Sequence, residues 1–112
     1  MSRKHERLRS DWRHYNEKDF GGLLTEPVFS VGRRERLVEG AFTYTNTGRN
    51  KRLMIKGEMF LEEKKYLAVL LHEMIHQWEL EVVGVCPQTE DHKGAFAEKA
   101  AELIAKYDVP IV

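Results

Sequence analysis

The stretch Leu71-His72-Glu73-Met74-Ile75-His76 is the most informative part of this chain. It carries an H-E-x-x-H pattern, and residues i and i+4 lie on one face of an α-helix, so His72 and His76 can bind one metal ion together. Glu73 follows the first histidine directly. Its carboxylate would lie beside the ion, where it can act as general base on a metal-bound water. The stretch therefore predicts a zinc site built on a helix.

The residues on both sides of this stretch predict a long amphipathic helix from about residue 62 to residue 82. Apolar side chains recur there at the spacing of a helix that buries one face, and neither glycine nor proline interrupts them. Gly84 and Pro87 then mark the end of the helix. The apolar positions that define the buried face are Leu67, Leu70, Leu71, Met74, Ile75 and Trp78.

A third protein ligand is expected, because catalytic zinc takes three and leaves the fourth position for water. The best candidate is His92, which follows the break at Gly84 and Pro87. It begins the inward face of a second helical pattern, and from there its side chain could point back at the metal. His72, His76 and His92 are thus the predicted Zn²⁺ ligands, and Glu73 is the predicted catalytic residue. The other members of the second pattern are Phe96, Ala100, Leu103, Ile104 and Tyr107.

Two other kinds of metal site fit parts of the same pattern. Cys86 lies between the second and third histidines, and its thiolate would complete a closed four-ligand site, which is structural rather than catalytic. The alternative for this cysteine is a buried, unreactive thiol. Glu73 and His76 also form the E-x-x-H half of a di-iron motif, but the sequence contains no second copy of it.

Two segments, His72-Glu73-Met74-Ile75-His76 and His92-Lys93-Gly94-Ala95-Phe96, resemble the core of the SprT-like family of zinc metallopeptidases, which includes the Spartan-related proteases. In that family a spacer of this size separates H-E-x-x-H from an H-G-x-x-F-like segment that supplies the third histidine. The resemblance extends more weakly over residues 15–24, Gly40 and residues 53–55. It implies a zincin-like fold and a zinc-dependent endopeptidase that acts on proteins associated with DNA or crosslinked to it.

The chain departs from the family pattern in two respects. Lys93 stands where the family has a glycine, and Gly94 follows it. Family members commonly carry a C-terminal zinc ribbon or DNA-binding tail, whereas this sequence has one cysteine and stops at Val112. The second departure bears on the dependence of activity on DNA, and it leaves the expected peptidase core intact.

The order of the predicted elements indicates one α+β domain over residues 1–112. A first helix is expected over residues 3–18, with His5, Leu8, Trp12 and Tyr15 on its buried face. Three short strands are expected at residues 27–31, 37–46 and 53–55, forming a small, mostly antiparallel sheet beside the active-site helix. The last helix is expected to carry the third metal ligand.

The charged residues are divided unevenly along the chain, although its formal net charge is zero. Residues 1–56 hold 13 Lys and Arg against 7 Asp and Glu, whereas residues 57–112 hold 5 against 11. The basic half could meet DNA, or it could be a set of solvated loops and one basic helix face. No apolar run is long enough for a membrane span, and no apolar signal peptide opens the chain. We therefore expect a cytoplasmic or nucleoid-associated protein that is not secreted.

Two classes of function follow from these features. The first is a zinc-dependent endopeptidase with a protein or peptide substrate. The second is a zinc-stabilised nucleic-acid-binding module that has the motif but does not cleave. Glu73 distinguishes them, because a structural zinc site needs no acid beside its ligands, whereas a peptidase needs one to accept a proton from water.

Overall fold

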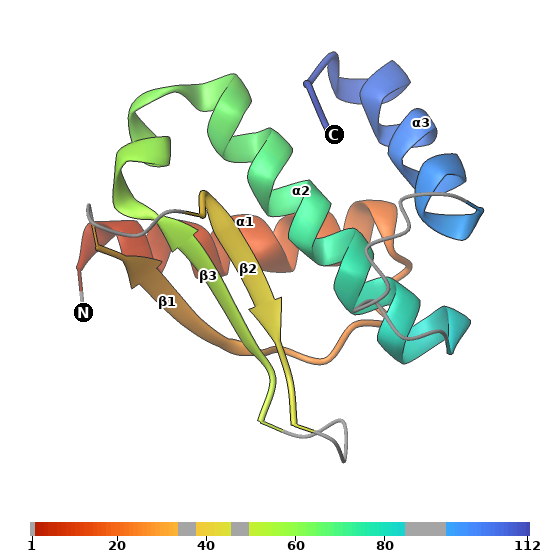
Figure 1. The fold of residues 1–112 in the computed structure, drawn as a ribbon, viewed down its shortest axis with the longest axis horizontal. Helices are drawn as coiled ribbons and strands as arrows, with labels where there is room; N and C mark the ends of the chain where they lie inside the picture. The colour runs from red at the N-terminus through yellow and green to blue at the C-terminus, as the bar shows by residue number, and fades with distance from the viewer. Residues whose placement is uncertain (1, 34–37, 46–49, 85–93) are drawn as a thin grey trace.

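The computed structural model describes residues 2–33, 38–45, 50–84 and 94–112. Over these ranges the chain is α+β, as predicted, with three α-helices and one small sheet (Figure 1). None of the helices in these ranges combines the length and the apolar character needed to cross a membrane. The elements are α1 (Arg3–Asp19), β1 (Val28–Gly32), β2 (Gly40–Thr43), β3 (Arg52–Lys56), the 3₁₀ turn η1 (Gly57–Leu61), α2 (Glu63–Trp78), the π-helical turn η2 (Glu79–Val83) and α3 (Ala95–Tyr107).

Helix α1 matches its predicted range to within one residue. Ser2 caps its N-terminus, where the side-chain oxygen accepts a hydrogen bond from the backbone N–H of His5 at 3.2 Å. Gly21 and Gly22 end it with φ angles of +63° and +70°, a region that favours glycine. The middle of the predicted buried face is buried as expected, at Leu8 and Trp12. Its two ends, at His5 and Tyr15, are only half-buried.

The sheet has the strand order β1-β3-β2, and β3 is its central strand. The prediction of a mostly antiparallel sheet is wrong for one of the two pairings. β2 pairs with β3 antiparallel, but β1 pairs with β3 in parallel. The difference arises because β3 inserts between β1 and β2, which are neighbours only in sequence. Its run of three buried residues, Leu53–Ile55, is typical of a strand covered on both faces.

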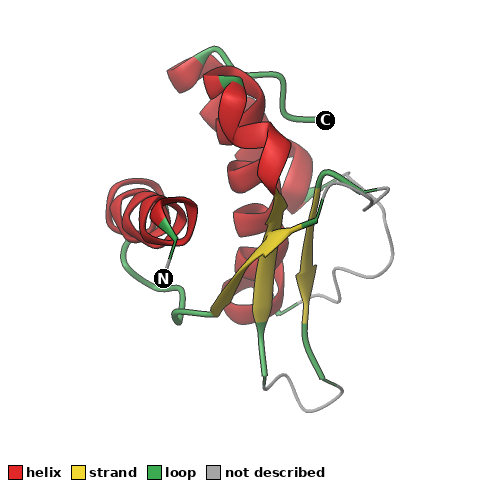
Figure 2. Cartoon of the chain, turned by 90° about the vertical axis from the view of Figure 1, so that its left-hand side faces the viewer, coloured by secondary structure: helices red, strands yellow, loops and turns green. Residues whose placement is uncertain are grey.

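Helices α1 and α2 pack on the same face of the sheet (Figure 2). Trp12 of α1 makes an edge-to-face contact with Phe29 of β1, with ring centroids 5.8 Å apart. The indole Nε1 of the same residue donates a hydrogen bond to Gln77 Oε1 of α2 at 3.1 Å. Trp12 therefore joins both helices to the sheet.

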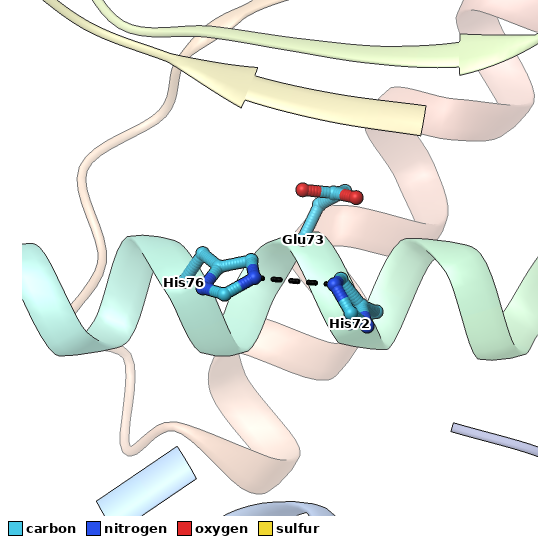
Figure 3. A group of neighbouring side chains, drawn as sticks. All are labelled: His72, Glu73 and His76. Carbon is cyan, nitrogen blue, oxygen red and sulfur yellow. Dashed lines mark hydrogen bonds between the residues drawn. The ribbon is translucent and has the colours of Figure 1, made fainter. Parts of the chain in front are cut away.

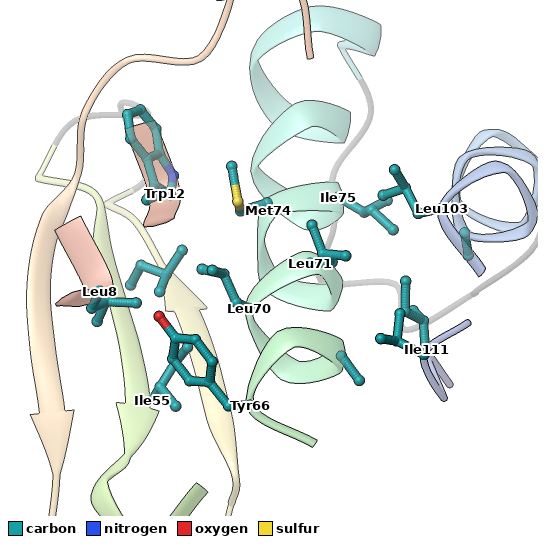
Figure 4. Packing of buried hydrophobic residues seen from close by; sticks show 14 of the residues in the cluster. Leu8, Trp12, Ile55, Tyr66, Leu70, Leu71, Met74, Ile75, Leu103 and Ile111 are labelled. Atoms are coloured by element: carbon teal, nitrogen blue, oxygen red, sulfur yellow. The ribbon is translucent and has the colours of Figure 1, made fainter. Parts of the chain in front are cut away.

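Helix α2 is buried on two sides, which is more than the single apolar stripe predicted for it (Figure 4). Leu70 and Met74 face β3 and α1, whereas Leu71 and Ile75 face α3 and the segment that follows it. All four side chains are 0% exposed. The predicted ends of the stripe, Leu67 and Trp78, are half-buried. Burial on two sides fixes how α2 is turned about its axis, and so it fixes which way the remaining residues point.

Helix α3 begins at Ala95, later than the predicted start at His92. Gly94 has a φ of +56°, which lies outside the right-handed helical region, so the helix cannot extend back through it. The helix therefore starts later than predicted, and the predicted third ligand, His92, lies outside the described residues. Beyond α3, Val109 and Ile111 are buried against the core. This contribution of the last residues to the core was not predicted.

Gln77 is a fully buried polar residue that links three segments of the chain. Its Oε1 atom accepts the hydrogen bond from Trp12, and its Nε2 atom donates to the carbonyl of Thr25 at 2.6 Å and to Glu81 Oε2 at 2.9 Å. The segment before β1 is thereby attached to the end of α2. Such a group is costly to remove, because the buried indole N–H of Trp12 is left without a hydrogen bond.

We predict that Gln77→Leu lowers the free energy of unfolding by about 2–4 kcal/mol, because the Trp12 Nε1–H and the Thr25 carbonyl each lose a buried partner. Urea titration followed by far-UV circular dichroism measures the change. Glu98→Gln on the exposed face of α3 is the control and should change the free energy of unfolding by no more than about 0.5 kcal/mol. Equal stability of Gln77→Leu and the wild type would show that these hydrogen bonds contribute nothing.

Candidate metal centre

Helix α2 places the two histidines of the H-E-x-x-H stretch one turn apart with their rings together (Figure 3). The Nε2 atoms of His72 and His76 lie 3.1 Å from each other. Two Zn–N bonds of about 2.0–2.1 Å at the tetrahedral angle would separate two nitrogens by about 3.3 Å. The two rings therefore hold their Nε2 atoms close to the spacing that a single ion requires.

Glu73 lies on the side of α2 that faces strand β2, next to the two histidines (Figure 3). Its side chain is buried, and burial raises the pKa of its carboxyl group to about 7. A hydrogen bond from the backbone N–H of Phe42 opposes this shift, because it favours the carboxylate. A carboxyl group with this pKa can both accept and release a proton near neutral pH.

Gly40 allows β2 to approach α2 closely at this position. A Cβ atom on Gly40 would lie 2.5 Å from Cγ1 of Val69 and 3.5 Å from Cγ of Glu73. The first distance is far below normal contact, so any larger residue would push the strand away from the helix. The sequence marked Gly40 only through the family resemblance, since a close approach between two distant segments leaves no local pattern.

Phe96 of α3 forms an apolar wall beside the two histidines. Its ring centroid lies 5.2 Å from that of His72 and 4.9 Å from that of His76. Phe96 is only 1% exposed, so it joins the metal centre to the core between α2 and α3. The helical pattern of the sequence identified this residue as buried, but it gave no indication of contact with both imidazoles.

Glu79 is a residue of this centre that the sequence analysis missed. Its Oε1 atom lies 3.0 Å from Nδ1 of His76, on the opposite side of that ring from the Nε2 atom. Glu79 is 7% exposed and is the first residue of the π-helical turn η2. Its spacing of three residues from His76 was the available signal, because side chains at i and i+3 are neighbours on a helix.

A cleft of about 390 Å³ opens next to His72 and Glu73. It lies between the start of β2 and the segment after α3, with α2 as its floor. Apolar residues form much of the lining, and two charged residues besides Glu73, namely Glu39 and Lys65, contribute to it. The full lining is Glu39, Gly40, Lys65, Ala68, Val69, His72, Glu73, Pro110 and Val112.

The raised pKa of Glu73 predicts how Glu73→Gln affects the metal-free protein. The folded state holds this proton up to about pH 7, whereas the unfolded chain releases it near pH 4.5, so wild-type stability should fall as the pH rises through this interval. Glutamine has no proton to lose. Glu73→Gln should therefore gain stability over the wild type between pH 4.5 and pH 7, by up to about 3 kcal/mol.

Chelator-treated protein unfolded in urea at several pH values measures this difference. Glu98→Gln, at an exposed position, should follow the wild type at every pH. A stability difference between Glu73→Gln and the wild type that stays constant from pH 4.5 to pH 8 would contradict the assigned pKa.

The structure brings together three of the four residues predicted for this site. His72, Glu73 and His76 place one potential ligand atom each within 4.8 Å of the others, and this group could hold a metal ion. The fourth residue, His92, and the alternative ligand Cys86 both lie outside the described residues. No protein-family model matches this chain, and a search of the curated proteins found no match either.

Proposed function

We propose that this protein is a zinc-dependent endopeptidase with a zincin-like arrangement of helix and edge strand, similar to the SprT-like family. The observation that carries the proposal is the paired Nε2 atoms of His72 and His76, 3.1 Å apart, with the buried carboxyl group of Glu73 beside them. A site that only stabilised the fold would have no use for a buried carboxyl group beside its ligands, whereas a peptidase needs one to accept a proton from water.

His72 and His76 would hold the ion through their Nε2 atoms, and His92 is the proposed third ligand. Imidazole nitrogens suit zinc, and this ion when bound supplies Lewis acidity and lowers the pKa of water. Glu73 would take a proton from water onto its carboxylate and then deliver it to the leaving amine of the cleaved peptide. The cation would itself favour the carboxylate form of Glu73, which places the general base in its active state.

Strand β2 offers a place for the substrate backbone. It is an edge strand of the described sheet, and it lies against the part of α2 that carries Glu73. An extended peptide can add to such an edge through main-chain hydrogen bonds. The cleft beside His72 would then take a neighbouring side chain of the substrate. Ala68 and Val69 line this cleft, so an apolar side chain would fit it best.

Proteins associated with DNA are the proposed substrates, on the strength of the family resemblance and the basic N-terminal half. Ion pairs within the protein reduce the positive charge available for contact with DNA. Three basic residues form such pairs: Arg7 with Glu63, Arg13 with Glu26, and Lys51 with Glu81. Exposed basic residues outside these ion pairs remain on α1 and in or next to the strands, namely Arg3, Lys4, Lys18, Arg33 and Arg52. The activity should therefore be tested with and without DNA.

We predict that zinc-loaded wild type cleaves a DNA-binding model protein and that Glu73→Gln cleaves it at least about 100-fold more slowly, because glutamine cannot accept the proton. Gel electrophoresis of timed reactions, with and without single-stranded DNA, measures the rates. Glu98→Gln should cleave like the wild type. A chelator should abolish cleavage, and added zinc should restore it.

Two outcomes would contradict the proposal. Equal cleavage by the wild type and Glu73→Gln would remove Glu73 from the reaction. Absence of cleavage by either protein, with one zinc bound per chain, would favour the zinc-stabilised nucleic-acid-binding module. Cleavage at the same rate with and without DNA would retain the peptidase and exclude DNA-dependent activity.

A further inference from the structure

The contact between Glu79 and His76 is buried and well formed. Glu79 Oε1 lies 3.0 Å from His76 Nδ1, and the two side chains are 9% and 14% exposed, respectively. Exposed polar contacts contribute little, but here both side chains are largely removed from water, which strengthens the hydrogen bond between them. The contact leaves the Nε2 atom of His76 directed at His72.

Because a carboxylate has no hydrogen to donate, this contact determines which ring nitrogen of His76 carries the hydrogen. A carboxylate only accepts hydrogen bonds, so the Nδ1 atom of His76 must carry the hydrogen. In the neutral ring, Nε2 of His76 then has the lone pair, which is the form that binds a metal. The same reasoning extends to His72 in the metal-free protein. When His76 is neutral its Nε2 atom accepts, and the Nε2 atom of His72, 3.1 Å away, is then the donor.

We propose that Glu79 is the positioning residue of the metal centre. Its carboxylate fixes the ring of His76 in the Nδ1–H tautomer and orients Nε2 toward the ion. A carboxylate in this position also makes the imidazole a more basic ligand. The inference rests on the proposed metal centre, and it adds to it a residue that lies outside the H-E-x-x-H stretch.

The two histidines therefore have different roles before metal binds. His76 is already in the tautomer that the ion requires. His72 must lose the hydrogen from Nε2 or move it to Nδ1 before it can bind through Nε2. This asymmetry is a direct consequence of the chain of contacts from Glu79 through His76 to His72.

Long-range ¹H–¹⁵N NMR of the metal-free protein tests the tautomers directly. The expected spectrum shows His76 as the Nδ1–H form and His72 as the Nε2–H form. Glu79→Gln keeps an oxygen acceptor and should keep the Nδ1–H form of His76, whereas Glu79→Leu should lose it. Finding His76 as the Nε2–H form in the wild type would overturn the proposal, whatever the protein does with metal or substrate.

Zn²⁺ affinity, measured by competition with a chelator of known affinity, gives the second readout. Glu79→Leu should bind Zn²⁺ about 10- to 100-fold more weakly than the wild type, and Glu79→Gln should show a smaller loss. Glu81→Gln is the matched control, because Glu81 lies in the same π-helical turn and is similarly buried. Its oxygens bond to Thr25, Gln77 and Lys51 rather than to a histidine.

Glu81→Gln should retain wild-type affinity to within about twofold even if it unfolds more easily. Wild-type affinity in Glu79→Leu, with the variant shown to be folded by circular dichroism, would overturn the proposal. Should Glu79→Leu fail to fold, the tautomer of His76 in the wild type and the Zn²⁺ affinity of Glu79→Gln still decide. Tight Zn²⁺ binding that depends on Glu79, in a protein that cleaves nothing, would support this inference and refute the proposed peptidase.

Discussion

The burial of α2 on two sides is the constraint on which the rest of the structure depends. Leu70 and Met74 are held by the sheet and α1, and Leu71 and Ile75 are held by α3 and the segment after it. A helix with 3.6 residues per turn that is fixed on these two sides has one remaining side for polar residues. His72 and His76 occupy it. The hydrophobic core therefore fixes the direction in which the two histidines point. Residues distant from the candidate metal centre thus contribute to its geometry.

The contact between β2 and α2 adds a second constraint. Gly40 permits close approach to Val69, and the backbone of Phe42 then reaches the carboxyl group of Glu73. Burial raises the pKa of Glu73, whereas the hydrogen bond from the Phe42 N–H lowers it, and the first effect is the larger. The strand that offers an edge to a substrate and the strand that sets the acidity of the proposed base are thus the same strand.

The helices and the pair of histidines could be predicted from the sequence, because both depend on local periodicity. The strand order could not, because the insertion of β3 between β1 and β2 depends on contacts between distant residues. Gln77 and Glu79 were missed for a related reason. Their spacing looks like that of any polar helix residue, and their roles appear only when Trp12 or a histidine ring lies beside them. His92 stays a prediction.

The segment after α3 has a consequence for how the protein is handled. Val109 and Ile111 are buried in the core, while Pro110 and Val112 line the cleft beside His72. An affinity tag joined after Val112 would start at the rim of this cleft and could compete with a bound molecule for the same space. A tag joined ahead of Ser2 would instead start at the exposed beginning of α1. Fusion at the N-terminus is therefore the better design for any experiment that depends on access to the metal centre.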